Sequence, residues 1–160
     1  MGCKTHTMKN IKTYTALLNE AEDQEELNRK LFLAALNGNT DEARLLLDRG
    51  AQIDVMSDGY APIHYGLHSS HTGILDLLLD RGAQIDPVNH HGETPLKMAV
   101  TFDRPHHAKF LILRGADPFK AFKDPAEILW FFDGDIDWWP EGDLRTKLKR
   151  MQRGKQAFGM

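Results

Sequence analysis

Short apolar runs recur along the chain at a nearly constant spacing. The runs are LLL at 45–47, LLL at 77–79 and FLI at 110–112. A glycine follows each run, at positions 50, 82 and 115, so the glycines are 32 and 33 residues apart. Each run is typical of the end of a helix, and each glycine is typical of a left-handed C-cap, because glycine adopts positive φ without steric cost. The pattern predicts a stack of repeated helical units.

One ten-residue segment occurs twice without any change. LLLDRGAQID stands at 45–54 and again at 77–86. A fixed period of about 33 residues is typical of repeat architectures, in which each unit packs only against its neighbours. Identical segments one unit apart therefore indicate identical packing roles.

Candidate helix starts lie upstream of the apolar runs. They are APIHYG at 61–66 and TPLKMA at 94–99. Thr94 is a candidate N-cap, and Pro95 suits the first helical turn, where its missing N–H would be unpaired anyway. In the third unit Pro105 lies in the turn between two helices. We expect it to delay the start of the second helix.

These motifs resemble the ankyrin repeat. TPLKMA and APIHYG are similar to the family's TPLHxA motif, and DGYAP and HHGETP are similar to the hairpin that opens each repeat. The resemblance implies an all-α solenoid of stacked helix-turn-helix units with hairpin loops. It places three repeats at residues 28–57, 58–89 and 90–122, of which the first lacks the TPLH start.

The flanking segments have no counterpart among the repeats. We expect a disordered tail at 1–9 and an N-terminal capping helix at 10–27, where apolar residues follow helical spacing. Residues 123–160 are predicted to form a C-terminal cap. The cap contains an acidic, tryptophan-bearing loop at 133–143, followed by a basic helix.

Composition narrows the class of protein. The 160 residues carry a formal net charge of −3, which gives no reason to expect nucleic-acid binding. A single cysteine, Cys3, excludes an internal disulfide framework and favours a reducing, cytoplasmic setting. No apolar run approaches the roughly 20 residues of a membrane span, so we expect no membrane association through a span.

Candidate chemistry is sparse. His64, His68 and His71 have a spacing that can bind zinc on a helix, but the resemblance gives His64 and His71 structural roles. The acidic loop lacks the glycine and the bidentate glutamate of an EF-hand calcium loop. Motifs of hydrolases, kinases and metalloproteases are absent. We therefore predict a protein that is not an enzyme and has no cofactor and no metal site.

The resemblance implies that function lies on the concave face of the stack, which ankyrin proteins use to bind proteins. Carried over position by position, that face contains Ser57, Asp58, Tyr60, His68, Ser69, His90, His91, Glu93, Thr101 and Phe102. Aromatic and histidine side chains suit an interface, because they offer contact area at low entropic cost. We expect an adaptor or inhibitor with one protein partner. A toxin-neutralising immunity protein and a phage or bacterial blocker of a host enzyme both fit that class.

The C-terminal cap leaves alternatives open. Trp138 and Trp139 suit either a hydrophobic lid on the last repeat or anchors in an interface, and we include both in the candidate surface. The acidic loop would suit a partner with a basic surface. The basic helix instead suggests binding to nucleic acid or a membrane surface, with the repeats as scaffold. A monomer is expected, with a homodimer as the alternative.

Overall fold

The computed structural model describes residues 23–124, 126–135 and 137–157. Three helix pairs form the body of the stack: α2 (Gln24–Asn37) with α3 (Thr40–Asp48), α4 (Pro62–Gly66) with α5 (Gly73–Asp80), and α6 (Pro95–Thr101) with α7 (Pro105–Leu113). They are followed by α8 (Pro118–Ala121), α9 (Ala126–Phe131) and α10 (Asp143–Ala157). Within the described ranges, extended residues pair only at the isolated bridge between Ser57 and Tyr60.

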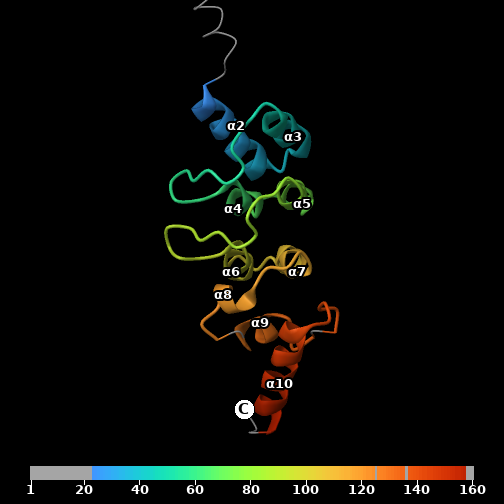
Figure 1. The fold of residues 1–160 in the computed structure, drawn as a ribbon. Coiled ribbons are helices and arrows are strands. Elements are labelled where there is room, and N and C mark those ends of the chain that lie inside the picture. Colours follow the sequence, from blue (N-terminus) through green and yellow to red (C-terminus); the bar gives the residue numbers. More distant parts are fainter. Residues whose placement is uncertain (1–22, 125, 136, 158–160) are drawn as a thin grey trace, which may run out of the picture.

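The helices stand in two columns. Figure 1 shows α2, α4 and α6 in one column and α3, α5 and α7 in the other. The loops that connect one pair to the next project from the side of the first column, away from the second. Fully buried leucines, such as Leu31, Leu75, Leu96 and Leu111, run from the first pair to the third. The stack therefore has one continuous apolar core, as expected for an all-α repeat solenoid.

Most of the predicted helix ends are confirmed. Thr94 is the N-cap of α6, where its hydroxyl oxygen accepts a hydrogen bond from the backbone N–H of Lys97, and Pro95 follows in the first turn. Gly50, Gly82 and Gly115 have φ of 99°, 93° and 98°. Each ends the last helix of its pair in the left-handed region, where a side chain would be strained.

The third pair differs from our expectation. Helix α7 begins at Pro105 itself, 32 residues after the start of α5, so its start is not delayed. The proline occupies the first turn, where a helix needs no backbone N–H, so it fixes the start of α7 and does not postpone it.

The N-terminal boundary also differs. Helix α2 runs without a break from Gln24 to Asn37, so the expected division between a cap at 10–27 and a repeat from residue 28 falls inside one helix. Asp23 starts this helix by accepting from the backbone N–H of Glu25. The tail at 1–9 and the first part of the predicted capping helix lie outside the described residues.

The turns after the repeated segment are joined by one recurring hydrogen bond. The carboxylate of Asp54 accepts from the backbone N–H of Gln84 at 3.0 Å. One unit later, the carboxylate of Asp86 accepts from the backbone N–H of Asp117 at 3.2 Å. At the first turn the side chain of Asn28 accepts from the backbone N–H of Gln52 at 2.8 Å. The last residue of LLLDRGAQID thus fastens each repeat to the next.

The same segment also supplies ion pairs between repeats. Arg81 reaches back to Asp48 with an N–O distance of 2.8 Å. Arg114, one unit later, pairs with Asp80 and with Asp76, the latter at 2.9 Å. Each arginine follows its helix, and each aspartate lies on the preceding one. The arginine before the glycine recurs in all three units, and with the aspartates of the preceding helix it forms a row of charge pairs along the second column.

The C-terminal cap closes the stack. Ile128 of α9, Trp139 and Leu148 of α10 are buried and belong to the same core as the repeats. Lys97 of α6 pairs with Glu127 of α9 at 3.2 Å. Helix α9 begins 31 residues after α6, close to the repeat period. It therefore continues the succession of first-column helices.

Candidate functional site

A hollow lies between the second and third helix pairs. Its volume is about 270 Å³. The lining residues come from the hairpin before α4, from α4 and the turn after it, and from α6 and its C-cap: Asp58, Tyr60, His64, Tyr65, His68, Met98 and Phe102. Four of these, Asp58, Tyr60, His68 and Phe102, were predicted from the sequence as surface residues. The structure brings them together although the chain separates them by up to 44 residues.

Tyr60 lies at the centre of a cluster of rings. Its ring centroid is 4.9 Å from that of His90, with the planes at 90°, and 5.9 Å from that of Tyr65. The rings of His90 and His91 are 3.8 Å apart. The edge-to-face contacts of Tyr60 are favourable beyond the area they bury. The predicted residues of both hairpins thus form one connected surface.

The second ring contact spans two helix pairs. His68, in the turn after α4, packs against Phe102 at the end of α6 with centroids 5.5 Å apart. Both side chains are exposed, and Phe102 keeps 45% of its surface accessible. This leaves the mouth of the hollow accessible from solvent.

Backbone conformation fixes the hairpin at the rim. Asp58 and Gly59 have φ of 50° and 80°, and Ser57 and Tyr60 exchange two hydrogen bonds of 2.9 Å across them. A Cβ at Gly59 would lie 2.6 Å from His90, whose backbone N–H donates to the carbonyl of Gly59. Because neighbouring hairpins touch here, only glycine fits at this position. The two hairpins therefore hold each other in place.

His64 forms the inner wall of the hollow. Its Nδ1 accepts a hydrogen bond of 3.0 Å from the backbone N–H of Ala61, which holds the start of α4. Burial lowers the pKa of His64, although carbonyl groups of Pro87 and Glu93 oppose this. The side chain is therefore neutral at neutral pH and has a structural role, as its position in the motif implied.

The remaining predicted residues of the hairpin face have mixed positions. By hairpin face we mean the hairpin tips together with the exposed sides of α4 and α6. His90, His91 and Thr101 are exposed there, while Ser57 and Glu93 are half-buried. The hydroxyl of Thr101 donates to the carbonyl of Lys97 within α6.

Ser69 requires a correction. Its side chain is buried, and its hydroxyl donates to the carbonyl of His71 inside the turn between α4 and α5. Its own carbonyl accepts from Arg104 of the next pair at 3.0 Å. A short polar residue in a turn gives no sign in sequence of whether its hydroxyl closes the turn or faces solvent. We remove Ser69 from the candidate surface.

Trp139 also requires a correction. Only 4% of its surface is exposed, because its side chain extends from the acidic loop into the core. Trp138 is half-buried and stacks on Trp139 with centroids 5.4 Å apart, and Lys109 of α7 lies over its ring. Of the two alternatives, the structure supports the hydrophobic lid. Neither tryptophan projects as an anchor for a partner.

Sequence reasoning missed the most exposed large aromatic residue among those described. Trp130 on α9 is 87% exposed, whereas its neighbours Ile128 and Leu129 are buried. The run ILWFF is apolar at every position, so its sequence gave no sign of which side faces outward.

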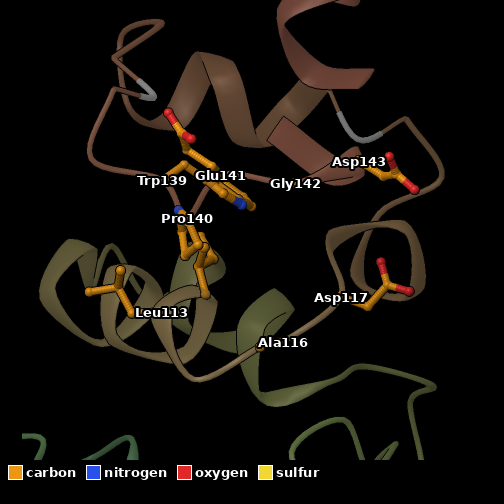
Figure 2. Close-up of a pocket in the computed structure, with 10 residues that line it drawn as sticks. Leu113, Ala116, Asp117, Trp139, Pro140, Glu141, Gly142 and Asp143 are labelled. Atoms are coloured by element: carbon orange, nitrogen blue, oxygen red, sulfur yellow. The ribbon is translucent and has the colours of Figure 1, made fainter. Parts of the chain in front are cut away.

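A second hollow, of about 410 Å³, lies between the end of α7 and the segment 139–143. Figure 2 shows Trp139 and Pro140 beside the last turn of α7, which carries Leu113. Asp117, Glu141 and Asp143 bring carboxylates to the same hollow. Glu141 pairs with Arg145 at 3.5 Å, and Asp117 caps α8 by accepting from Phe119. These contacts give both carboxylates roles within the fold.

The acidic loop and the basic helix pair with each other. Asp137 contacts Arg145 at 3.2 Å and Lys149 at 3.3 Å. The hydrogen bond from Lys149 and then that from Arg145 lower the pKa of Asp137. Two cations of α10 and two anions of the loop are therefore engaged inside the cap. Opposite charges that the sequence separates by about ten residues form one local network.

The part of the chain that the structure describes contains neither a metal-binding cluster nor a membrane-spanning helix. There, no group of three or more His, Cys, Asp and Glu side chains could hold a metal ion. The helices described are too short or too polar to cross a membrane.

Comparison with known proteins gives a clear family match. A family model described as ankyrin repeats (3 copies) matches residues 6–89 and 31–121, which together span well over half of the chain. No curated protein matches the chain.

Proposed function

The chain belongs to the ankyrin-repeat family, whose repeats are protein–protein interaction modules, and we propose that it binds one protein partner through its hairpin face. It acts there as a non-enzymatic adaptor or inhibitor, by occupying a surface of the partner. Toxin-neutralising immunity proteins and blockers of a host enzyme are examples of such inhibitors.

One observation carries this proposal. Asp58, Tyr60, His68 and Phe102 come from two different repeats, yet they line one hollow that opens on the hairpin face. Tyr60 and Phe102 supply aromatic area, and aromatic residues are enriched where binding energy concentrates. An exposed ring at Phe102 adds nothing to the core of the stack. Its position therefore favours contact with the protein partner.

The structure changes how a basic partner would be recognised. Asp137 and Glu141 of the acidic loop already pair with Arg145 and Lys149. This pairing reduces the charge that the loop offers to a partner. A partner with a basic surface remains part of the proposal, with the hairpin face as the point of contact.

The alternative, binding of nucleic acid or a membrane surface through α10, is less well supported by the geometry. Arg145 and Lys149 face the acidic loop, and Lys147 lies over the ring of Phe119 at 5.6 Å. Phosphate binding would have to compete with these contacts. Substitution of the exposed cations Lys147, Arg150 and Arg153 by glutamine keeps buried Leu148 in place. It should abolish such binding and should leave binding through the hairpin face intact.

The proposal is tested with the double variant Tyr60→Ala/Phe102→Ala. The partner is first captured on the immobilised full chain and identified, and its affinity is then measured with purified proteins. We expect the double variant to weaken binding at least about tenfold, since truncation of anchor residues commonly costs more than 1.4 kcal/mol.

A matched control separates this face from other exposed aromatic surface. Trp130→Ala removes a ring that is more exposed than either of the two and that lies on α9, outside the hollow. It should leave the affinity unchanged. Wild-type affinity in a double variant whose circular dichroism and thermal midpoint show an intact fold would exclude the hairpin face as the binding surface.

A further inference from the structure

The hollow on the hairpin face has an unusual combination of walls. Aromatic rings from Tyr60, Tyr65 and Phe102 provide much of its lining, and Asp58 places a carboxylate at the rim. Among the residues that the structure describes, no lysine or arginine lines it. The described lining residues thus combine aromatic area with one carboxylate, and both an aromatic ring face and a carboxylate attract a cation.

Asp58 has no cation of its own among the described residues. None of the ion pairs found there involves it. Its backbone is held at φ 50° by the tight hairpin, so the hairpin fixes the point at the rim from which the side chain extends. Most aspartates on the second column of helices, by contrast, are matched with arginine, as Asp48 is with Arg81.

The charge of Asp58 reaches the wall of the hollow. Burial raises the pKa of Tyr65, and the nearby carboxylate of Asp58 raises it further. The phenol hydroxyl of Tyr65 donates a hydrogen bond of 3.5 Å to the carbonyl oxygen of Ser57, which joins the ring to the hairpin that carries Asp58. His64 brings no opposing charge at neutral pH, because burial lowers its pKa.

We propose that this hollow receives the cationic head of one lysine or arginine side chain from the protein partner. The inference rests on the proposed function and adds the chemistry of the contact. A cation over the rings gains cation–π attraction, and the carboxylate at the rim adds a charge pair.

Size favours a single side chain over a free small molecule. The volume of about 270 Å³ lies below the roughly 300–1,000 Å³ that is usual for small-molecule pockets. An anion would face Asp58 at close range, and a purely apolar side chain would bury that carboxylate without a partner. Binding of either group would be less favourable than binding of a cation, which pairs with the carboxylate.

The test uses defined probes and the full chain. Nα-acetyl-arginine methyl ester carries the cationic head, and Nα-acetyl-citrulline methyl ester is its neutral counterpart of nearly the same shape. Each is titrated into the ¹⁵N-labelled protein, and amide shifts are followed by NMR at low salt. We expect the arginine ester to shift amides around Asp58, Tyr65, His68 and Phe102, and to bind more tightly than the citrulline ester. Nα-acetyl-lysine methyl ester should shift the same amides.

Two variants identify the groups that hold the cation. Asp58→Asn keeps the size of the side chain and tolerates positive φ, so it removes only the charge. We expect it to weaken binding of the arginine ester about two- to fivefold, as for a partly exposed charge pair. Phe102→Leu keeps an apolar side chain without the ring and should weaken binding by a similar factor, with little effect on the citrulline ester.

Asp133→Asn is the matched control for charge. Asp133 also has positive φ, at 52°, and is exposed, but it lies after α9 outside the hollow. This variant changes the net charge by the same amount and should bind the arginine ester as wild type does.

Three results would overturn the inference: equal affinity for the two esters, no shifts at the hollow, or an equal loss in Asp58→Asn and Asp133→Asn. None of these results would touch the proposed function, which fails only if Tyr60→Ala/Phe102→Ala leaves partner affinity unchanged.

Discussion

Two histidines are kept neutral by their surroundings, and this makes the stability of the protein depend on pH. Burial lowers the pKa of His64 from its ordinary 6.5, and burial also lowers that of His107, helped by the charge of Arg104. Below about pH 6.5 the unfolded chain therefore binds more protons than the folded one. The free energy of unfolding is therefore highest above that pH, where both histidines are neutral in either state, and it decreases as the pH falls.

We accordingly expect the urea midpoint of the wild type to fall between pH 7.5 and pH 5.5. His107→Gln should make this fall shallower, because one of the two buried imidazoles is gone. His91→Gln replaces an exposed histidine that is not among the groups acting on His107, so its curve should follow the wild type. Equal slopes for all three proteins would show that His107 is not the group responsible.

A second residue-scale prediction concerns the turn joined by Asp54. Asp54→Ala removes the acceptor for the backbone N–H of Gln84 and should lower the free energy of unfolding by about 1 kcal/mol. Asp54→Asn keeps an acceptor oxygen at the same place and should retain most of that stability. Chemical denaturation of the three proteins measures both effects. If Asp54→Asn lowered the free energy of unfolding as much as Asp54→Ala, the negative charge and not the hydrogen bond would be the source of the stability.

Identical residues in the repeated segment differ in exposure, which marks a limit of sequence reasoning. Leu45 is 57% exposed and Leu77 only 6%. Helix α5 has α3 packed behind it, whereas no described residue covers the outer side of α3. The pattern predicted the ankyrin repeats and several helix ends, such as the N-cap at Thr94 and the glycine at the end of each second helix, because these depend on neighbours in sequence. The burial of Ser69 and Trp139 depends on what packs against them, and no local pattern records that.

At the scale of elements, the cap is held by contacts between the acidic loop and α10. The side chain of Arg145 is only 15% exposed and touches both Asp137 and Glu141. Sequence showed the two opposite charge blocks but not their pairing, since a charge block suits an external partner equally well.

Arg145→Ala should therefore release the loop without unfolding the repeats. We expect faster amide hydrogen exchange at 137–142 by several-fold, with unchanged exchange in α4 to α7. Arg150→Ala, an exposed substitution on the same helix, is the control and should leave the loop as protected as before. Equal exchange in both variants would mean that the hydrophobic contacts of Trp139 alone hold the loop.

At the scale of the whole molecule, the single core predicts that repeats and cap unfold together. All three tryptophans, Trp130, Trp138 and Trp139, belong to the cap, so fluorescence reports the cap alone, while far-UV circular dichroism reports every helix. Buried residues of the cap join the core of the repeats. We expect the two urea transitions to coincide.

A core substitution in the third repeat extends this prediction. Leu111→Ala opens a cavity at a fully buried position and should cost about 2–5 kcal/mol. Because the core is continuous, both the fluorescence and the dichroism transitions should shift by the same amount. A shift seen by dichroism alone would show that the cap is an independent unit.

The repeated segment LLLDRGAQID has a consequence for how the number of repeats can change. Recombination between the two copies of LLLDRGAQID would remove 32 residues and keep the rest of the sequence unchanged. Asp54 would then accept the hydrogen bond that Asp86 now accepts from Asp117. Arg114 would then meet Asp48 in place of Asp80, and would meet Arg44 in place of Asp76. The shortened protein would keep one of the three ion pairs in this row and would lose the other two, together with the whole aromatic hollow. Two identical copies of LLLDRGAQID therefore let the stack change length by one whole repeat. The hollow on the hairpin face is lost or gained in the same step.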